Sequence, residues 1–147
     1  MIIFSILFLL ATITYTQATQ EAVDIALVGR SWTLGYYDDW AGKLEGVRRE
    51  LHNGPDAVQF YYFCDKATGE HKKNCGAWVD KKGNKIASAV LAVSRNEEGA
   101  VFSNLKVSDS AMYSRLPEST DEYQRLLQRV SLFVTEGPTT TTPSNPY

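Results

Sequence analysis

The chain has 147 residues, of which 44% are hydrophobic and 22% are charged, and its formal net charge at pH 7 is −2. This length suits one domain, and the apolar fraction allows a real hydrophobic core. The charges are mixed in sign and no basic block or stripe occurs, so the composition excludes the usual footprint of a nucleic-acid or anionic-membrane binder.

The N-terminal segment has the pattern of a secretory signal. Residues Ile2 to Ile13 are apolar apart from one serine and one threonine, a run too short to span a bilayer as a helix. Small or neutral residues follow up to Ala18, so we expect a signal peptide over residues 1–18 and a secreted, extracellular chain. No second apolar run follows, and no membrane span is expected.

The first part of the domain contains one clear strand signal and one ambiguous segment. Trp32, Leu34 and Tyr36 alternate after a glycine turn, which predicts a strand with these three side chains facing the core. Residues 38–52 instead have apolar residues at helical spacing, ending at an Asn-Gly-Pro stop signal. This pattern favours a short helix, and a strand flanked by loops is the alternative.

Residues 57–64 are the strongest strand signal in the chain, because they are aromatic, β-branched and bounded by turn formers. One face carries Val58, Phe60 and Tyr62, and the other face includes Tyr61 and Phe63. Both faces are apolar or aromatic. One of them is therefore either covered by another element or exposed as an adhesive surface.

The chain has two cysteines, Cys64 and Cys75. In an oxidising compartment these form the expected disulfide, which would stabilise the fold by about 3 kcal/mol. A metal site that also uses His71 is the alternative, but it would need reduced thiols and a fourth ligand. We therefore expect no metal and no cofactor.

Three further strands complete the expected sheets, the first of them at residues 75–80. The segments 88–94 and 129–135 have strand patterns, and the second carries Val130, Leu132 and Val134 on one face. A long polar connection over residues 117–125 precedes the last strand, and residues 138–147 form a disordered tail rich in Thr and Pro.

The segment from Ala100 to Ser114 is the most specific in the chain. Ala100 and Phe102 share one face of a strand, Leu105 closes the end of the core, and an Asp-Ser-Ala-Met-Tyr run follows. This run resembles the E strand, turn and F strand of immunoglobulin domains, in which the tyrosine hydroxyl bonds back to upstream backbone.

The resemblance implies an all-β, Ig-like antiparallel β-sandwich of the variable type over residues 22–137, with one short helix in the B–C connection. It places residues 57–64 on strand C, with Phe60 where these domains carry a core tryptophan, and makes the disulfide a staple of the C–C′ hairpin. The expected structural core is Trp32, Leu34, Tyr36, Phe60, Phe102, Leu105, Asp109 and Tyr113.

The chain departs from the family where the two sheets are usually joined by a disulfide. Tyr36 and Arg115 occupy the two cysteine places. In one arrangement, Arg115 lies over the Tyr36 ring and reaches a carbonyl or carboxylate. In the other, a bulge turns Arg115 outward. We favour the bulge, because a buried arginine needs a more elaborate environment. Asp109 would take a basic partner, either Lys85 or Arg95.

No catalytic motif occurs, so we expect no enzyme activity. The resemblance implies a recognition module for an extracellular protein or cell-surface ligand, with no nucleic-acid partner and with room for a homodimer through the aromatic sheet face. Candidate contacts come from the C–C′–F–G sheet and the long loops, namely Tyr61, Phe63, Trp78, Tyr123 and Arg125. A lipocalin-like carrier of a small apolar ligand is the alternative function.

Overall fold

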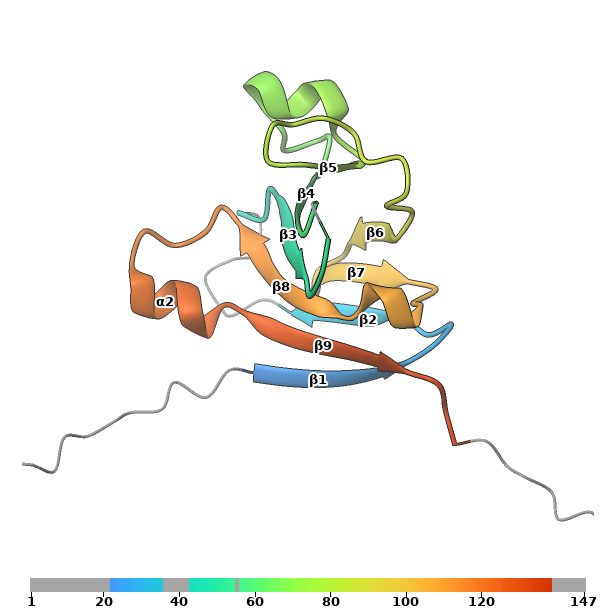
Figure 1. Ribbon diagram of the computed structural model, residues 1–147. Coiled ribbons are helices and arrows are strands. Elements are labelled where there is room, and N and C mark those ends of the chain that lie inside the picture. The colour runs from blue at the N-terminus through green and yellow to red at the C-terminus, as the bar shows by residue number, and fades with distance from the viewer. Residues whose placement is uncertain (1–21, 36–42, 55, 139–147) are drawn as a thin grey trace, which may run out of the picture.

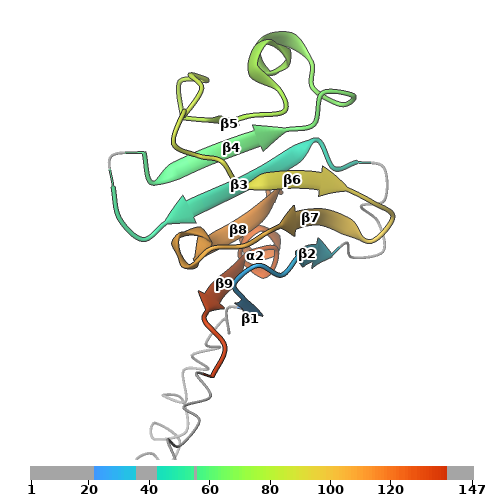
Figure 2. The same cartoon turned by 90° about the vertical axis from the view of Figure 1, so that its right-hand side faces the viewer.

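The computed structural model describes residues 22–35, 43–54 and 56–138. These residues form two facing sheets, one of six strands in the order β1-β9-β8-β3-β4-β5 and one of three in the order β2-β7-β6 (Figure 1; Figure 2). The strands are β1 (Ala22–Leu27), β2 (Trp32–Gly35), β3 (Gly46–Leu51), β4 (Val58–Tyr62), β5 (Trp78–Val79), β6 (Ala92–Arg95), β7 (Gly99–Ser103), β8 (Ala111–Leu116) and β9 (Val130–Thr135).

This strand order is that of an Ig-like sandwich, as the sequence predicted. Strands β3, β8 and β9 take the C, F and G places, β4 and β5 add C′ and C″, and β2, β7 and β6 take B, E and D. Strand β1 pairs in parallel with β9 and so joins the larger sheet. The two sheets are separate layers over a filled core, which is not the closed barrel of a lipocalin.

The centre of the core is a cluster of three aromatic rings from both sheets. The Trp32 ring centroid lies 5.2 Å from those of Phe102 and Tyr113, which are themselves 4.9 Å apart. The Tyr113 hydroxyl donates to the Asp109 carbonyl at 2.6 Å, which confirms the predicted tyrosine corner. Burial raises the pKa of Tyr113 to about 12. The motif around Tyr113 therefore predicted the centre of the hydrophobic core.

The helix expected over residues 38–52 is wrong where the structure describes it. Gly46–Leu51 is strand β3, which pairs with β8 on one side and β4 on the other. A Cβ atom at Gly46 would lie 2.2 Å from the Tyr61 carbonyl oxygen, so the close backbone approach requires glycine. Tertiary pairing therefore overrides the helical spacing. The rest of this prediction lies outside the described residues, as does Tyr36.

The placement of Phe60 at the core centre is also wrong. With β3 in the C place, residues 58–62 become the next strand, C′, so they lie one strand further from the centre. Phe60 is half-buried and faces outward beside Arg48 of β3. Gln59, Tyr61 and Phe63 occupy the inward positions of this segment instead.

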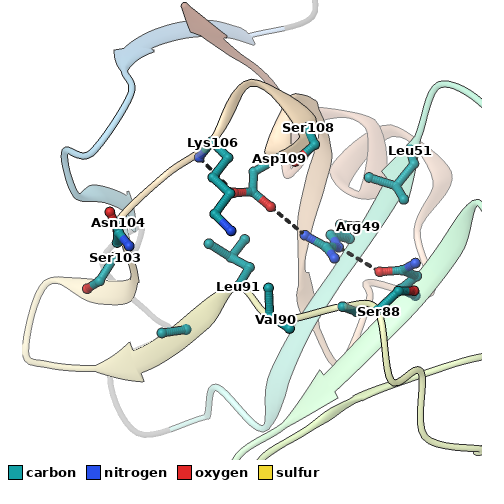
Figure 3. Close-up of a pocket in the computed structure, with 13 residues that line it drawn as sticks. Arg49, Leu51, Ser88, Val90, Leu91, Ser103, Asn104, Lys106, Ser108 and Asp109 are labelled. Carbon is teal, nitrogen blue, oxygen red and sulfur yellow. Dashed lines mark hydrogen bonds and ion pairs between the residues drawn. The ribbon is translucent and has the colours of Figure 1, made fainter.

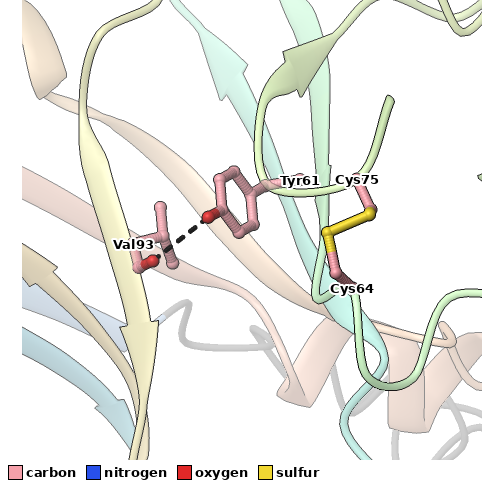
Figure 4. Close-up of a disulfide and its surroundings, with 4 residues drawn as sticks. All are labelled: Tyr61, Cys64, Cys75 and Val93. Atoms are coloured by element: carbon pink, nitrogen blue, oxygen red, sulfur yellow. Dashed lines mark hydrogen bonds between the residues drawn. A yellow bond between two sulfur atoms is a disulfide. The ribbon is translucent and has the colours of Figure 1, made fainter. Parts of the chain in front are cut away.

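The predicted disulfide between Cys64 and Cys75 is present, with the Cα atoms 5.0 Å apart (Figure 4). Because each sulfur is bonded to the other, the alternative metal site is excluded. The bond ties the connection between β4 and β5, which holds the 3-10 helix η1 (Gly69–Asn74). It therefore staples C′ to C″ and not C to C′ as expected.

The remaining elements follow the sequence closely. Strand β9 lies where residues 129–135 predicted it, with Leu132 and Val134 buried, and β6 falls at the end of the predicted segment 88–94. A second 3-10 helix, η2 (Val107–Asp109), precedes β8. The connection between β8 and β9 carries a short helix, α2 (Glu122–Leu127), rather than only loop. No helix among the described residues is long and apolar enough to cross a membrane.

Candidate functional site

Three of the predicted contact residues lie inside the sandwich and not on its surface. Trp78 is 1% exposed and Phe63 7%, and both rings lie 5.6 Å from the Tyr61 ring. The Tyr61 hydroxyl donates to the Val93 carbonyl at 3.2 Å, as Figure 4 shows, and the Trp78 indole donates to the Leu91 carbonyl at 2.9 Å. These aromatic residues therefore join the two sheets, because the pairing of β4 with β5 places Tyr61 and Trp78 side by side on the inner face.

The two predicted loop contacts are accessible. Tyr123 is 53% exposed on α2, and Arg125 on the same helix is half-buried. Asp121 caps the start of this helix, because its side chain accepts from the Gln124 backbone N–H at 2.8 Å. Tyr123 and Arg125 therefore lie on a short ordered helix, apart from the three inward-facing aromatic residues.

Asp109 takes its basic partner from β3, and neither Lys85 nor Arg95 serves. Arg49 lies 3.3 Å from the Asp109 carboxylate and donates from Nε to Gln59 at 2.8 Å. Its guanidinium also lies 4.1 Å from the centre of the Trp78 ring. Arg95 pairs instead with Asp65 on the surface. Arg49 could not be identified from the sequence as the partner of Asp109, because a helix was expected here, whereas strand β3 turns the Arg49 side chain inward.

An open cavity of about 510 Å³ lies beside this ion pair, between the β5–β6 connection and the turn before β8 (Figure 3). The guanidinium of Arg49 points toward Asp109, as Figure 3 shows, and also donates to Gln59, so its charge is neutralised within the protein. Asp109 also accepts from the Lys106 backbone N–H at 2.8 Å. The arrangement is that of a structural ion pair.

Arg115 remains inside the sandwich, in the cysteine place. It lies opposite Val47 in a regular β3–β8 ladder, is 3% exposed and donates to the Gly35 carbonyl of the facing sheet. The outward bulge is therefore wrong, because uninterrupted pairing keeps Arg115 on the inward face. Leu116 is buried as well. A charged hydrogen bond between the sheets occupies the position of the usual covalent one.

The most exposed apolar surface lies on the outer face of β1 and β9. Ile25 and Phe133 are register partners and are 73% and 47% exposed, while Val23 and Leu27 on the same face of β1 are 57% and 42% exposed. We call these four residues the β1–β9 patch. His52 lies beside it, with its ring 6.3 Å from that of Phe133. Contiguous apolar surface of this kind is typical of interaction sites.

The sequence reasoning missed this patch, although its signal is present. Side chains of residues 22–27 point alternately to the two faces of the sheet. Asp24 lies on the inner face and accepts from the Trp32 indole at 2.9 Å, so Val23, Ile25 and Leu27 lie on the outer face. Phe133 is likewise an apolar residue in an outward position of β9. Apolar residues at strand positions that face solvent are the feature that would have revealed the patch.

Comparison with known proteins adds little to this description. No protein-family model matches the chain, and no curated protein sequence does. Among solved structures, the chain is similar to CD84, whose crystal structure was described with reference to SLAM family function. The TM-score is 0.41 at 10% sequence identity, over 80% of this chain and 100% of that chain. The fold assignment rests on the strand order and register given above.

Proposed function

We propose that this chain is a secreted recognition module without catalytic activity, which binds an extracellular protein through the β1–β9 patch. The observation that carries the proposal is the exposure of Ile25 and Phe133, side by side on a domain whose core is otherwise filled. The predicted signal peptide supports the extracellular location.

The shape and composition of the patch favour a protein over a small ligand. The patch is one face of a sheet rather than a concave pocket, and small ligands bind in concave sites. An aromatic ring surrounded by aliphatic side chains is the composition of a binding hot spot, and polar Ser131 and Thr135 lie beside it on β9. Strand β1 is also an edge of its sheet, so its outer side can accept a strand from a partner.

Paired substitutions test the role of the patch. The variant carrying Ile25→Ser and Phe133→Ser should lose at least tenfold in affinity for cell-surface protein, because both side chains contribute apolar contact area. Val90→Ser is the matched control, since Val90 is 70% exposed in the β5–β6 connection, outside the patch. Binding of the mature domain to intact cells is measured by flow cytometry, and thermal unfolding verifies that each variant is folded.

The result has clear consequences either way. Binding lost in the double variant and kept in the control supports the proposal, whereas equal binding by all three proteins overturns it. Sedimentation of the purified domain identifies the partner further, because self-association lost in the double variant would make that partner a second copy of this chain.

A further inference from the structure

The charges of this chain are unevenly distributed along the sequence. Residues 65–85 contain six of the fifteen Lys and Arg residues but only three of the seventeen Asp and Glu residues. This segment is therefore positive, while the rest of the chain is negative. It folds as η1, β5 and the turn after β5, at the far edge of the larger sheet from β1 (Figure 1; Figure 2).

Two loops of this segment enclose a cavity of about 320 Å³. Lys73 from η1 and Lys81 and Lys82 from the turn line it, and Glu70 is the acidic residue in its wall. None of the three lysines forms an ion pair with any part of the chain that the structure describes. The cavity therefore offers positive charge to a ligand. No basic run in the sequence predicts this, because the fold brings the lysines together.

The two loops are held in place before any ligand binds. The disulfide closes the η1 loop, and the Asn74 side chain donates to the Gly83 carbonyl at 2.9 Å, which joins η1 to the turn. The Asp80 carboxylate accepts from the backbone N–H groups of Lys82 and Asn84, each at 2.8 Å. A site formed in advance loses less conformational entropy on binding.

Aromatic rings form one wall of the cavity. The Tyr62 and His71 rings, which line it, are stacked with their centroids 4.0 Å apart. Phe60 lies next to Tyr62 in a nearly parallel plane but does not line the cavity. Tyr62 also brings a hydroxyl that can donate a hydrogen bond, and burial, with a smaller contribution from Glu45, raises its pKa above the ordinary value. The wall thus presents apolar rings next to a hydroxyl and the side chains of the lysines.

We propose that this cavity binds an acidic oligosaccharide, through sulfate or carboxylate groups on its sugar rings. The lysines neutralise the anionic groups, the aromatic rings pack against the apolar faces of the sugars, and Asn74 and Asn84 lie in the wall where sugar hydroxyls need partners. A nucleic acid is the competing occupant, because its phosphates would meet the same lysines, and the test below compares the two ligands directly.

This inference goes beyond the proposed protein recognition, because it assigns a second ligand class to a different part of the same sheet. The expected secretory route would bring the domain into contact with sulfated and carboxylated glycans. The two activities are separable, since Ile25 and Phe133 lie near the β1 edge of the sheet and η1 lies at the opposite edge, beside β5.

The test uses a heparin-derived octasaccharide as the probe, with binding measured by calorimetry at several salt concentrations. The variant with Lys81→Gln and Lys82→Gln should bind about twentyfold more weakly, since each lysine near a dense anionic surface contributes about fivefold. The slope of log affinity against log salt concentration should also be smaller in magnitude by about one to two for this variant. The matched control, Arg30→Gln with Lys106→Gln, removes the same charge from exposed residues outside the site and should change affinity less than twofold.

A third variant separates a formed site from general electrostatic attraction. His71→Ala should weaken binding several-fold while leaving the salt dependence unchanged, because it removes part of the aromatic wall and no lysine. Equal losses in the two charge variants would overturn the proposal. Tighter binding to a single-stranded oligonucleotide or to anionic vesicles than to the octasaccharide would also overturn it. The Ile25→Ser and Phe133→Ser variant should keep full octasaccharide affinity, so failure of one proposal is distinguishable from failure of the other.

Discussion

The centre of the sandwich and its β4–β5 edge are held together by different means. At the centre, where immunoglobulin domains carry a disulfide between the sheets, the Trp32, Phe102 and Tyr113 rings pack and Arg115 donates a hydrogen bond across the gap. At the edge, the disulfide closes a polar loop, and no residue of η1 is buried.

This difference shows where a covalent bond is needed. The centre removes a large apolar surface from water, so it is stable without a disulfide between the sheets. The η1 loop has no such burial, so it would lose its order without the disulfide. The two regions should consequently respond very differently to substitution.

The largest effect is expected at the centre. Phe102→Ala should lower the free energy of unfolding by about 3–5 kcal/mol, because Phe102 is fully buried between two aromatic rings. Urea denaturation measures the change. A loss below about 1 kcal/mol would show that the ring cluster is not the main stabilising contact. Phe133→Ala is the control, since this exposed ring should cost far less.

The buried ion pair should come next. Asp109→Ala leaves the Arg49 guanidinium without its carboxylate in a buried position and should cost about 3 kcal/mol. Asp65→Ala breaks the surface pair with Arg95 and should cost less than about 1 kcal/mol. Equal losses in the two variants would contradict the structural role given to the buried pair. Urea denaturation at neutral pH makes the comparison.

The buried phenol should make stability depend on pH in alkaline solution. The pKa of Tyr113 is about 12 in the folded protein, above the ordinary value of 10.0, so the fold favours the neutral phenol. Its contribution, on the order of 2–3 kcal/mol, is complete below pH 10 and is lost as the pH rises from 10 to 12.

Tyr113→Phe removes this contribution together with the hydrogen bond to Asp109. Unfolding free energies of both proteins at pH 8, 10 and 11.5 should show the advantage of the wild type shrinking as the pH rises. A constant difference between the two proteins would contradict the raised pKa.

The smallest global effect is expected at the edge. Replacing Cys64 and Cys75 with Ser should cost between about 2 and 3 kcal/mol, since the loop that the disulfide closes is short. Hydrogen exchange should accelerate over residues 65–76 and leave β7 and β8 protected. Faster exchange at the centre would show that the disulfide also supports the sheet contacts. Octasaccharide affinity should fall in the same variant, because the cavity wall includes η1.

The parts of the fold that could be predicted from the sequence are those with local chemical signals. The Asp-Ser-Ala-Met-Tyr run identified β8 and the tyrosine corner, and alternation identified the inward faces of β2 and β9. The two cysteines, together with the expected secretory signal, identified the disulfide. Each of these signals depends on residues close together in the chain.

The parts that could not be predicted depend on contacts distant in sequence. The helical spacing around Val47 was outweighed by two neighbouring strands, β4 and β8, that no local pattern reveals. That one assignment moved Phe60 to the wrong strand and hid Arg49 as the partner of Asp109. The lysine-lined cavity was missed for the same reason, since it depends on the meeting of two loops, whereas the β1–β9 patch had a local signal in the alternation of residues 22–27 that was overlooked.

The parallel pairing of β1 with β9 has a mechanical consequence. The chain enters the domain at Ala22 and leaves it after Thr135, at opposite ends of the same two-stranded ladder (Figure 1). Tension between the chain ends slides one strand along the other and strains the whole row of backbone hydrogen bonds together, rather than opening them one by one. Stretching of single molecules should therefore show abrupt rupture at high force, not gradual opening.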